Sequence, residues 1–89
     1  MLPTRRLKKN RELHTARRAW ERYSLDFTKA EQQKAVRKIQ LGQSRSIHKL
    51  SRSNRYRAHS LTVEGVDICV IYDKVYKHIV TVLPEDKDG

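Results

Sequence analysis

The chain has 89 residues, with 20 lysines and arginines against 10 aspartates and glutamates, a formal net charge of +10. This length allows one domain with a modest core and excludes a large closed active site. The single cysteine, Cys69, excludes an internal disulfide and a cysteine-based metal cluster. No apolar run reaches the roughly 20 residues that a transmembrane helix needs.

The N-terminal part of the chain is predicted to be a basic arm followed by a helix. Residues 1–9 are interrupted by Pro3 and are otherwise mostly charged, which indicates an irregular arm. From Asn10, a residue type that caps helices, apolar residues recur at spacings of three and four. These apolar residues are Leu13, Ala16, Trp20 and Tyr23. The pattern predicts a helix from Asn10 to about Tyr23 with this stripe packed against the core.

A second helix is predicted from Thr28 to about Leu41. Thr28 and Glu31 have the spacing of a capping box, and Gly42 is a typical C-terminal stop. The residues expected to face the core are Ala35, Val36 and Ile39. A short connection between the two helices makes them antiparallel neighbours.

After Gly42 the pattern changes to that of β-strands. The predicted strands are Ser46–Leu50, Arg55–Val63, Val66–Tyr72 and Tyr76–Leu83. Glu64 and Gly65 form a two-residue hairpin turn between the second and third strands. The expected fold is α+β, in the order α-α-β-β-β-β, with two N-terminal helices packed on one face of a three- to four-stranded antiparallel sheet. One domain then spans residues 10–84, and residues 85–89 form a charged tail.

The basic residues are concentrated in two stretches, which favours a polyanionic partner such as RNA. The residues that we expect to contact nucleic acid are Arg17, Arg18, Arg45, Lys49, Arg52 and Arg55. A solvated basic face with no specific partner is the alternative. A membrane surface is disfavoured, because the basic helix lacks a broad apolar face. With no apolar stretch behind the basic N-terminus, we expect no secretory signal and a cytoplasmic protein.

Three residues are candidates for chemistry: His14 on the first helix, Arg57 on a strand and Thr81 on the last strand. Arg17 and Arg18 follow His14 by three and four residues, so they share its helical flank and disfavour the charged imidazole. RNA cleavage by transesterification needs a base for the 2′-OH proton and cations for the phosphate, which His and Arg supply without a metal. Each residue also has a simpler interpretation, as a surface histidine, a phosphate-positioning arginine and an ordinary strand threonine.

No metal or cofactor is expected. The four histidines are His14, His48, His59 and His78. None has helical ligand spacing to another or clusters with carboxylates, and the chain contains no P-loop, dinucleotide-binding or zinc-finger pattern.

Four segments together resemble a known family. They are RELHTARRAWERYSLDFT, IQLGQ, RYRAHSLTVEGVDICVIYD and HIVTVLP. Their layout over roughly residues 10–84 is similar to the RelE/BrnT-like toxins, small proteins of the barnase–EndoU–colicin–RelE group of metal-independent ribonucleases.

The resemblance implies a groove in which His14 acts as general base, Arg57 stabilises phosphate charge and Thr81 holds the phosphate. Arg17, Arg18 and Arg55 would assist. It also implies mRNA or tRNA as substrate and an acidic antitoxin or a host protein as a partner. Some relatives bind macromolecules without cutting them, so two functions stay open. One is a toxin-like endoribonuclease, and the other is a non-catalytic module that binds nucleic acid or protein.

Overall fold

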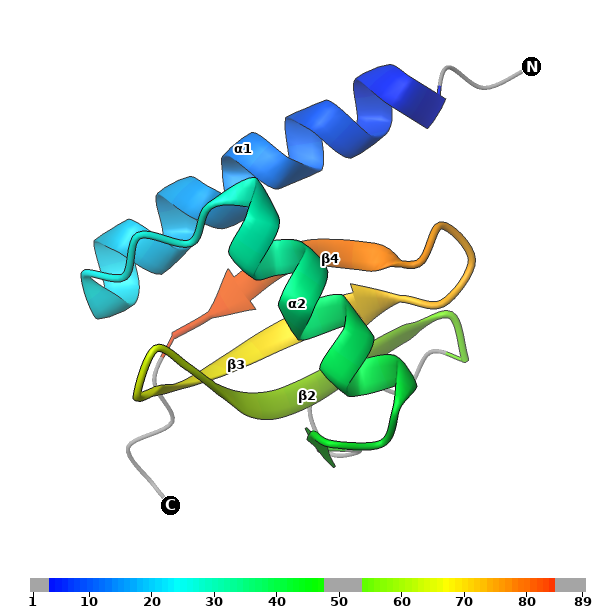
Figure 1. The fold of residues 1–89 in the computed structure, drawn as a ribbon. Helices are drawn as coiled ribbons and strands as arrows, with labels where there is room; N and C mark the ends of the chain where they lie inside the picture. Colours follow the sequence, from blue (N-terminus) through cyan, green and yellow to red (C-terminus); the bar gives the residue numbers. More distant parts are fainter. Residues whose placement is uncertain (1–3, 48–53, 85–89) are drawn as a thin grey trace.

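The computed structural model describes residues 4–47 and 54–84. Two helices come first, α1 (Thr4–Tyr23) and α2 (Lys29–Gln40). Four strands follow: β1 (Arg45–Ser46), β2 (Tyr56–Val63), β3 (Val66–Asp73) and β4 (His78–Leu83). All neighbouring strands are antiparallel, in the order β1-β2-β3-β4 (Figure 1). The predicted α+β fold and its order of elements are confirmed.

The first helix is longer than the sequence pattern indicated. It begins at Thr4, not at Asn10, so residues 4–9 of the expected irregular arm are helical. These six residues contain no glycine or proline, and lysine, arginine and leucine are good helix formers. A run of charged residues therefore did not indicate where α1 begins.

The predicted orientation of α1 is wrong. Leu13 and Trp20 are each 63% exposed, whereas Thr15 and Ala19 are fully buried. Small side chains let the helix approach β4 closely, and the Thr15 hydroxyl donates a hydrogen bond to the carbonyl of Ile79 (3.4 Å). The face of α1 that is buried is thus the one with small side chains that fit against β4, not the one on which the large apolar residues recur.

Helix α1 runs along β4 at the edge of the sheet (Figure 1). An edge strand presents backbone groups that lack a strand partner. Besides Thr15, Arg22 Nη1 donates to the carbonyl of Val82 (2.7 Å) and the Tyr23 hydroxyl donates to that of Leu83 (2.8 Å). Polar side chains of α1 therefore replace the missing neighbouring strand.

Helix α2 lies across one face of the sheet, which we call the core face (Figure 1). The amide of Glu31 donates to Thr28 Oγ1 (3.3 Å), so the predicted cap is confirmed. Ala35 and Ile39 are buried as expected, and Val36 packs beside them. Gly42 has a φ of +75°, and the next amide, of Gln43, returns to the Lys38 carbonyl (2.8 Å). This closes the helix with a Schellman motif.

The β2–β3 hairpin has the predicted two-residue turn. Val63 pairs with Val66, and Glu64 and Gly65 between them both have positive φ, 49° and 77°. Positive φ at both positions is the signature of a type I′ turn, whose twist matches that of the flanking strands.

All four strands differ from the prediction at one or both ends. Strand β2 begins at Tyr56 rather than Arg55, and β3 ends at Asp73 rather than Tyr72. Strand β4 begins at His78 rather than Tyr76, because the Asp73 carboxylate accepts bonds from the amides of Val75 and Tyr76 and folds this segment into a turn. Strand β1 is Arg45–Ser46, and residues 48–50 of the expected first strand lie outside the described residues.

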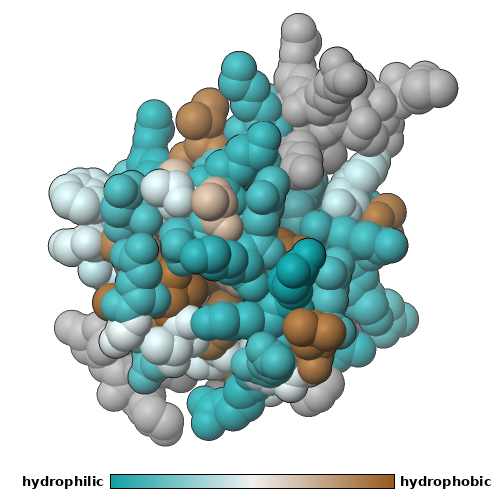
Figure 2. All heavy atoms as spheres, in the orientation of Figure 1, coloured by the Kyte–Doolittle hydropathy of each residue, from teal (hydrophilic) through white to brown (hydrophobic). Residues whose placement is uncertain are grey.

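The core lies between the sheet and the two helices. It contains Ala19, Leu25, Phe27, Ala35, Ile39, Leu61, Val63, Ile68, Val70, Tyr72, Ile79 and Val82. Cys69 is buried on the other face of the sheet, which we call the opposite face. The surface seen in Figure 2 is mostly hydrophilic, with separate apolar spots.

Candidate nucleic-acid interface

The structure brings together two of the three candidate catalytic residues. His14 Nε2 lies 3.1 Å from Thr81 Oγ1, and His14 is exposed while Thr81 is half-buried. Thr15 and Ala19 anchor α1 to the β4 edge. The neighbouring side of α1 that carries His14, which we call the His14 flank, is therefore turned toward the opposite face of the sheet. On that face Thr81 is paired with Ile71 of β3.

Arg57 is not part of this pair. It is opposite Tyr72 in the β2–β3 register, and Tyr72 belongs to the core face. Side chains alternate along a strand, so the row that contains Ile71 and Thr81 projects from the other side. The predicted centre of His14, Arg57 and Thr81 is therefore not assembled: β3 separates the strands of Arg57 and Thr81, and the sheet separates their side chains.

Other cations lie on the His14 flank. Arg11 and Arg18 are three residues before and four residues after His14, the spacings that place side chains on one flank of a helix. Arg18 pairs with Glu21 at 3.3 Å and keeps 38% of its side chain exposed. Arg17, three residues after His14, is exposed and lies on the side of His14 away from the buried Thr15 and Ala19. Arg18 is consequently the predicted RNA contact on the side of His14 that faces the sheet.

A buried carboxylate joins the start of this flank to the sheet. Asp73 is fully buried and accepts from Arg11 Nη1 at 2.7 Å. Arg55 donates to the same carboxylate twice, from Nε at 3.1 Å and from Nη2 at 3.0 Å. Arg11 Nη1 is also 2.8 Å from His78 Nε2, and since arginine only donates, that nitrogen accepts. Arg55, a predicted phosphate contact, thus serves first as a structural partner of Asp73.

The charge of this cluster is fixed by its hydrogen bonds. Burial by itself raises the pKa of Asp73. The bonds from Arg55 and Arg11, and those from the amides of Val75 and Tyr76, outweigh burial and hold this pKa far below its usual range. In turn, the hydrogen bond to Asp73 raises the pKa of Arg55. The carboxylate is therefore ionised and paired with the two guanidinium groups.

Aromatic rings surround the Arg55 guanidinium. Its central carbon lies 5.0 Å from the ring centre of Tyr56 and 5.1 Å from that of Tyr76. The Tyr76 ring in turn stacks on His78, with 5.9 Å between centres and 21° between planes.

The sequence pattern did not predict this cluster, because Arg11 and Asp73 are 62 residues apart. The only local signal was an aspartate at the end of an apolar strand.

One of the remaining predicted contacts, Arg45, does not join the His14 flank. Arg45 is exposed on β1, with β2 and β3 between it and β4. It lines an open groove of about 560 Å³ with Lys38 and Asp67. Lys49 and Arg52 lie outside the described residues.

Within residues 4–47 and 54–84, no three histidine, cysteine, aspartate or glutamate side chains are grouped so that they could hold a metal ion. Over the same residues, no helix has both the length and the apolar character to cross a bilayer. Comparisons with protein-family models, curated proteins and solved structures returned no match. The similarity to RelE/BrnT-like toxins accordingly stays a prediction.

Proposed function

We propose that this protein binds RNA in the cytoplasm through the His14 flank of α1 and the adjoining Thr81 of β4. One observation carries the proposal: the His14–Thr81 contact lies beside Arg18, and Arg11, bound to Asp73, is on the same flank of the helix. Arginine, histidine and threonine are side chains that contact phosphate and sugar oxygens, and a net charge of +10 favours a polyanion.

The pair also suits RNA in particular. A ribose 2′-hydroxyl both donates and accepts hydrogen bonds, and it distinguishes RNA from DNA. An imidazole nitrogen and a threonine hydroxyl can each take either role. The His14–Thr81 pair therefore offers a match for this group.

Cleavage of the bound RNA is the second candidate function, and the position of His14 favours it. His14 Nδ1, the ring nitrogen that is not in contact with Thr81, would take the 2′-OH proton as O2′ attacks the phosphorus. The bond from phosphorus to O5′ would break, leaving a 2′,3′-cyclic phosphate and a 5′-hydroxyl whose proton comes from water. Arg18, on the same flank, would replace Arg57 as the cation that stabilises the phosphate. Thr81 would orient the imidazole through the 3.1 Å contact.

Binding is tested by fluorescence anisotropy with a labelled single-stranded oligoribonucleotide at low salt. Arg18→Gln should weaken binding roughly three- to tenfold, because one phosphate contact is lost. Lys34→Gln is the matched control, since Lys34 is also paired with a glutamate three residues away but lies on α2. Equal effects of the two substitutions, or no binding by the wild type, would contradict the proposal.

The same RNA, incubated in EDTA, separates the two functions. If His14 is a general base, His14→Ala should keep binding while the rate of cutting falls about 10²–10⁴-fold. If the wild type binds the RNA but leaves it intact, the protein is a binding module without catalysis.

A further inference from the structure

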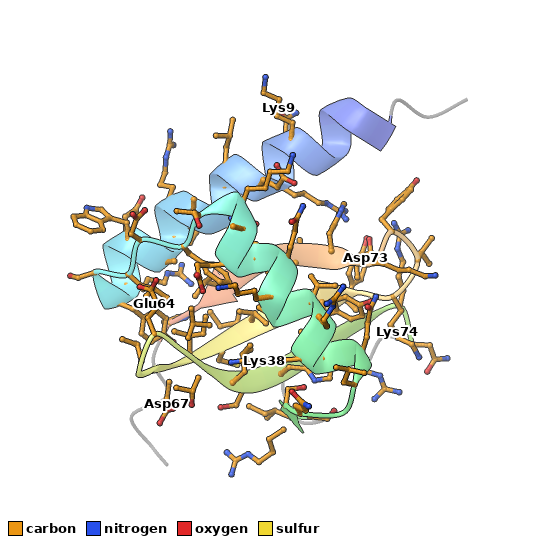
Figure 3. All side chains as sticks on the ribbon, viewed as in Figure 1. Lys9, Lys38, Glu64, Asp67, Asp73 and Lys74 are labelled. Carbon is orange, nitrogen blue, oxygen red and sulfur yellow. The ribbon has the colours of Figure 1, made fainter. Side chains whose placement is uncertain are left out.

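Arg57 lines a separate cleft on the core face of the sheet. The cleft has a volume of about 290 Å³ and lies where the C-terminal end of α2 meets β2 and β3. Its polar lining comprises Gln40, Ser46, Arg57, His59, Tyr72 and Lys74. Figure 3 shows Lys74 at the end of the sheet near this end of α2. The sheet stands between this cleft and the His14 flank.

Three polar side chains of the cleft, Gln40, His59 and Tyr72, are held in place by one another and by Ser44. Gln40 Nε2 donates to the Tyr72 hydroxyl oxygen at 3.2 Å, so the Tyr72 hydroxyl keeps its own hydrogen for another acceptor. Ser44 Oγ lies 2.9 Å from His59 Nδ1 and fixes the orientation of the ring. His59 and Tyr72 meet edge to face, 6.2 Å apart at 84°. These contacts prepare the cleft before any ligand enters.

The charge of the cleft is positive. Arg57 and Lys74 contribute two cations, and none of its described lining residues is acidic. Asp73, the residue before Lys74, is buried on the opposite face in the cluster with Arg11 and Arg55. It therefore does not neutralise Lys74. An anion is the ligand that this environment favours.

Phosphate is the anion that the donors fit best. A guanidinium presents a planar pair of N–H groups to two phosphate oxygens, while an ammonium acts as a compact charge and a phenol adds one more donor. The volume lies at the lower end of the range for small-molecule sites, about 300–1,000 Å³. It suits a single phosphate-bearing unit.

We infer that this cleft binds the phosphate group of a nucleotide and forms a second anion site, independent of RNA binding at the His14 flank. The phosphate can come from a free mononucleotide or from an RNA strand. Both present the same oxygens to Arg57, Tyr72 and Lys74.

The test is NMR titration of the ¹⁵N-labelled full chain with inorganic phosphate, adenosine 5′-monophosphate and octauridylate. Phosphate and the mononucleotide should shift the amide signals of residues 57–59 and 72–74. Arg57→Gln and Lys74→Gln should each weaken this binding by about tenfold, since each removes a charged donor. Arg37→Gln, which removes an exposed arginine of α2 outside the cleft, should leave it unchanged.

The three ligands distinguish the two sources. Octauridylate that shifts the cleft signals together with those of the His14 flank indicates an RNA strand, whereas shifts by the mononucleotide alone indicate a free nucleotide. The inference is overturned if phosphate and mononucleotide leave the cleft signals unmoved, or if Lys74→Gln binds like Arg37→Gln. Lys74 is exposed, so its substitution tests the cleft even if Arg57→Gln does not fold. The titrations with phosphate and mononucleotide do not depend on RNA binding at the His14 flank, so the two proposals can fail separately.

Discussion

Trp20 shows how strongly the role of one side chain depends on its place in the fold. It is the largest apolar side chain of α1, yet it lies on the solvent side of the helix, 63% exposed. Phe27, in the connection between the helices, is 1% exposed and part of the core. The aromatic anchor of the helical layer is therefore Phe27 and not Trp20.

Substitution of these two aromatic residues should have very different effects. Trp20→Ala is expected to change the free energy of unfolding by no more than about 0.5 kcal/mol, because the side chain is mostly in water already. Phe27→Ala should cost about 3–5 kcal/mol through lost burial and a cavity. Urea denaturation of both variants measures this, and a Trp20→Ala loss as large as that of Phe27→Ala would show that the helix faces the other way.

At the scale of elements, the cluster around Asp73 holds α1 to the sheet through contacts outside the apolar core. Asp73 ends β3, Arg11 comes from α1, His78 begins β4 and Arg55 precedes β2. Figure 3 labels Asp73 beside the start of β4. A buried carboxylate that loses its charge would leave two arginines without their counter-ion.

Asp73→Asn should destabilise the protein by about 3–5 kcal/mol at neutral pH, the usual cost of breaking a buried ion pair. Because the pKa of Asp73 is lower in the folded than in the unfolded chain, its contribution is present above the unfolded pKa, about 4, and declines as the pH falls below it. The difference between wild type and Asp73→Asn should therefore shrink from pH 7 to pH 3 in urea denaturation.

Asp26→Asn provides the control for this pH dependence, since Asp26 is exposed. It should change stability little at either pH. A difference for Asp73→Asn that is constant, or that grows in acid, would contradict the assignment of an ionised carboxylate.

At the scale of the whole molecule, positive charge extends over both faces of the sheet. The His14 flank adjoins the opposite face, whereas the cleft with Arg57 and Lys74 opens on the core face. Arg55 belongs to neither region, because its guanidinium is bound to Asp73. The two binding regions that we propose therefore lie on opposite faces of the sheet.

The affinity for RNA should depend on salt according to the number of phosphates contacted. The logarithm of the binding constant is expected to fall against the logarithm of salt concentration with a slope of roughly −0.7 per phosphate on a single strand. Arg18→Gln should flatten the slope by about one such unit, and Lys34→Gln should not. Affinity that is insensitive to salt would exclude a polyanion as the partner.

Local sequence signals were enough for the elements whose structure depends on neighbours in the chain. The Thr28 cap, the Gly42 stop and the Glu64–Gly65 turn each act within a few residues, and all are present where the pattern indicated. The order of helices and strands followed from the same local signals. The composition also determined the basic character on which the RNA proposal depends.

The tertiary structure decided which side chains meet. Thr15 rather than Trp20 faces β4 because the edge carbonyls needed donors and a close approach, which no helical period encodes. Arg57 and Thr81 are on different faces because β3 lies between their strands and side chains alternate along each one. The Asp73 cluster unites residues 62 positions apart, whose contact exists only once α1 lies along the completed sheet.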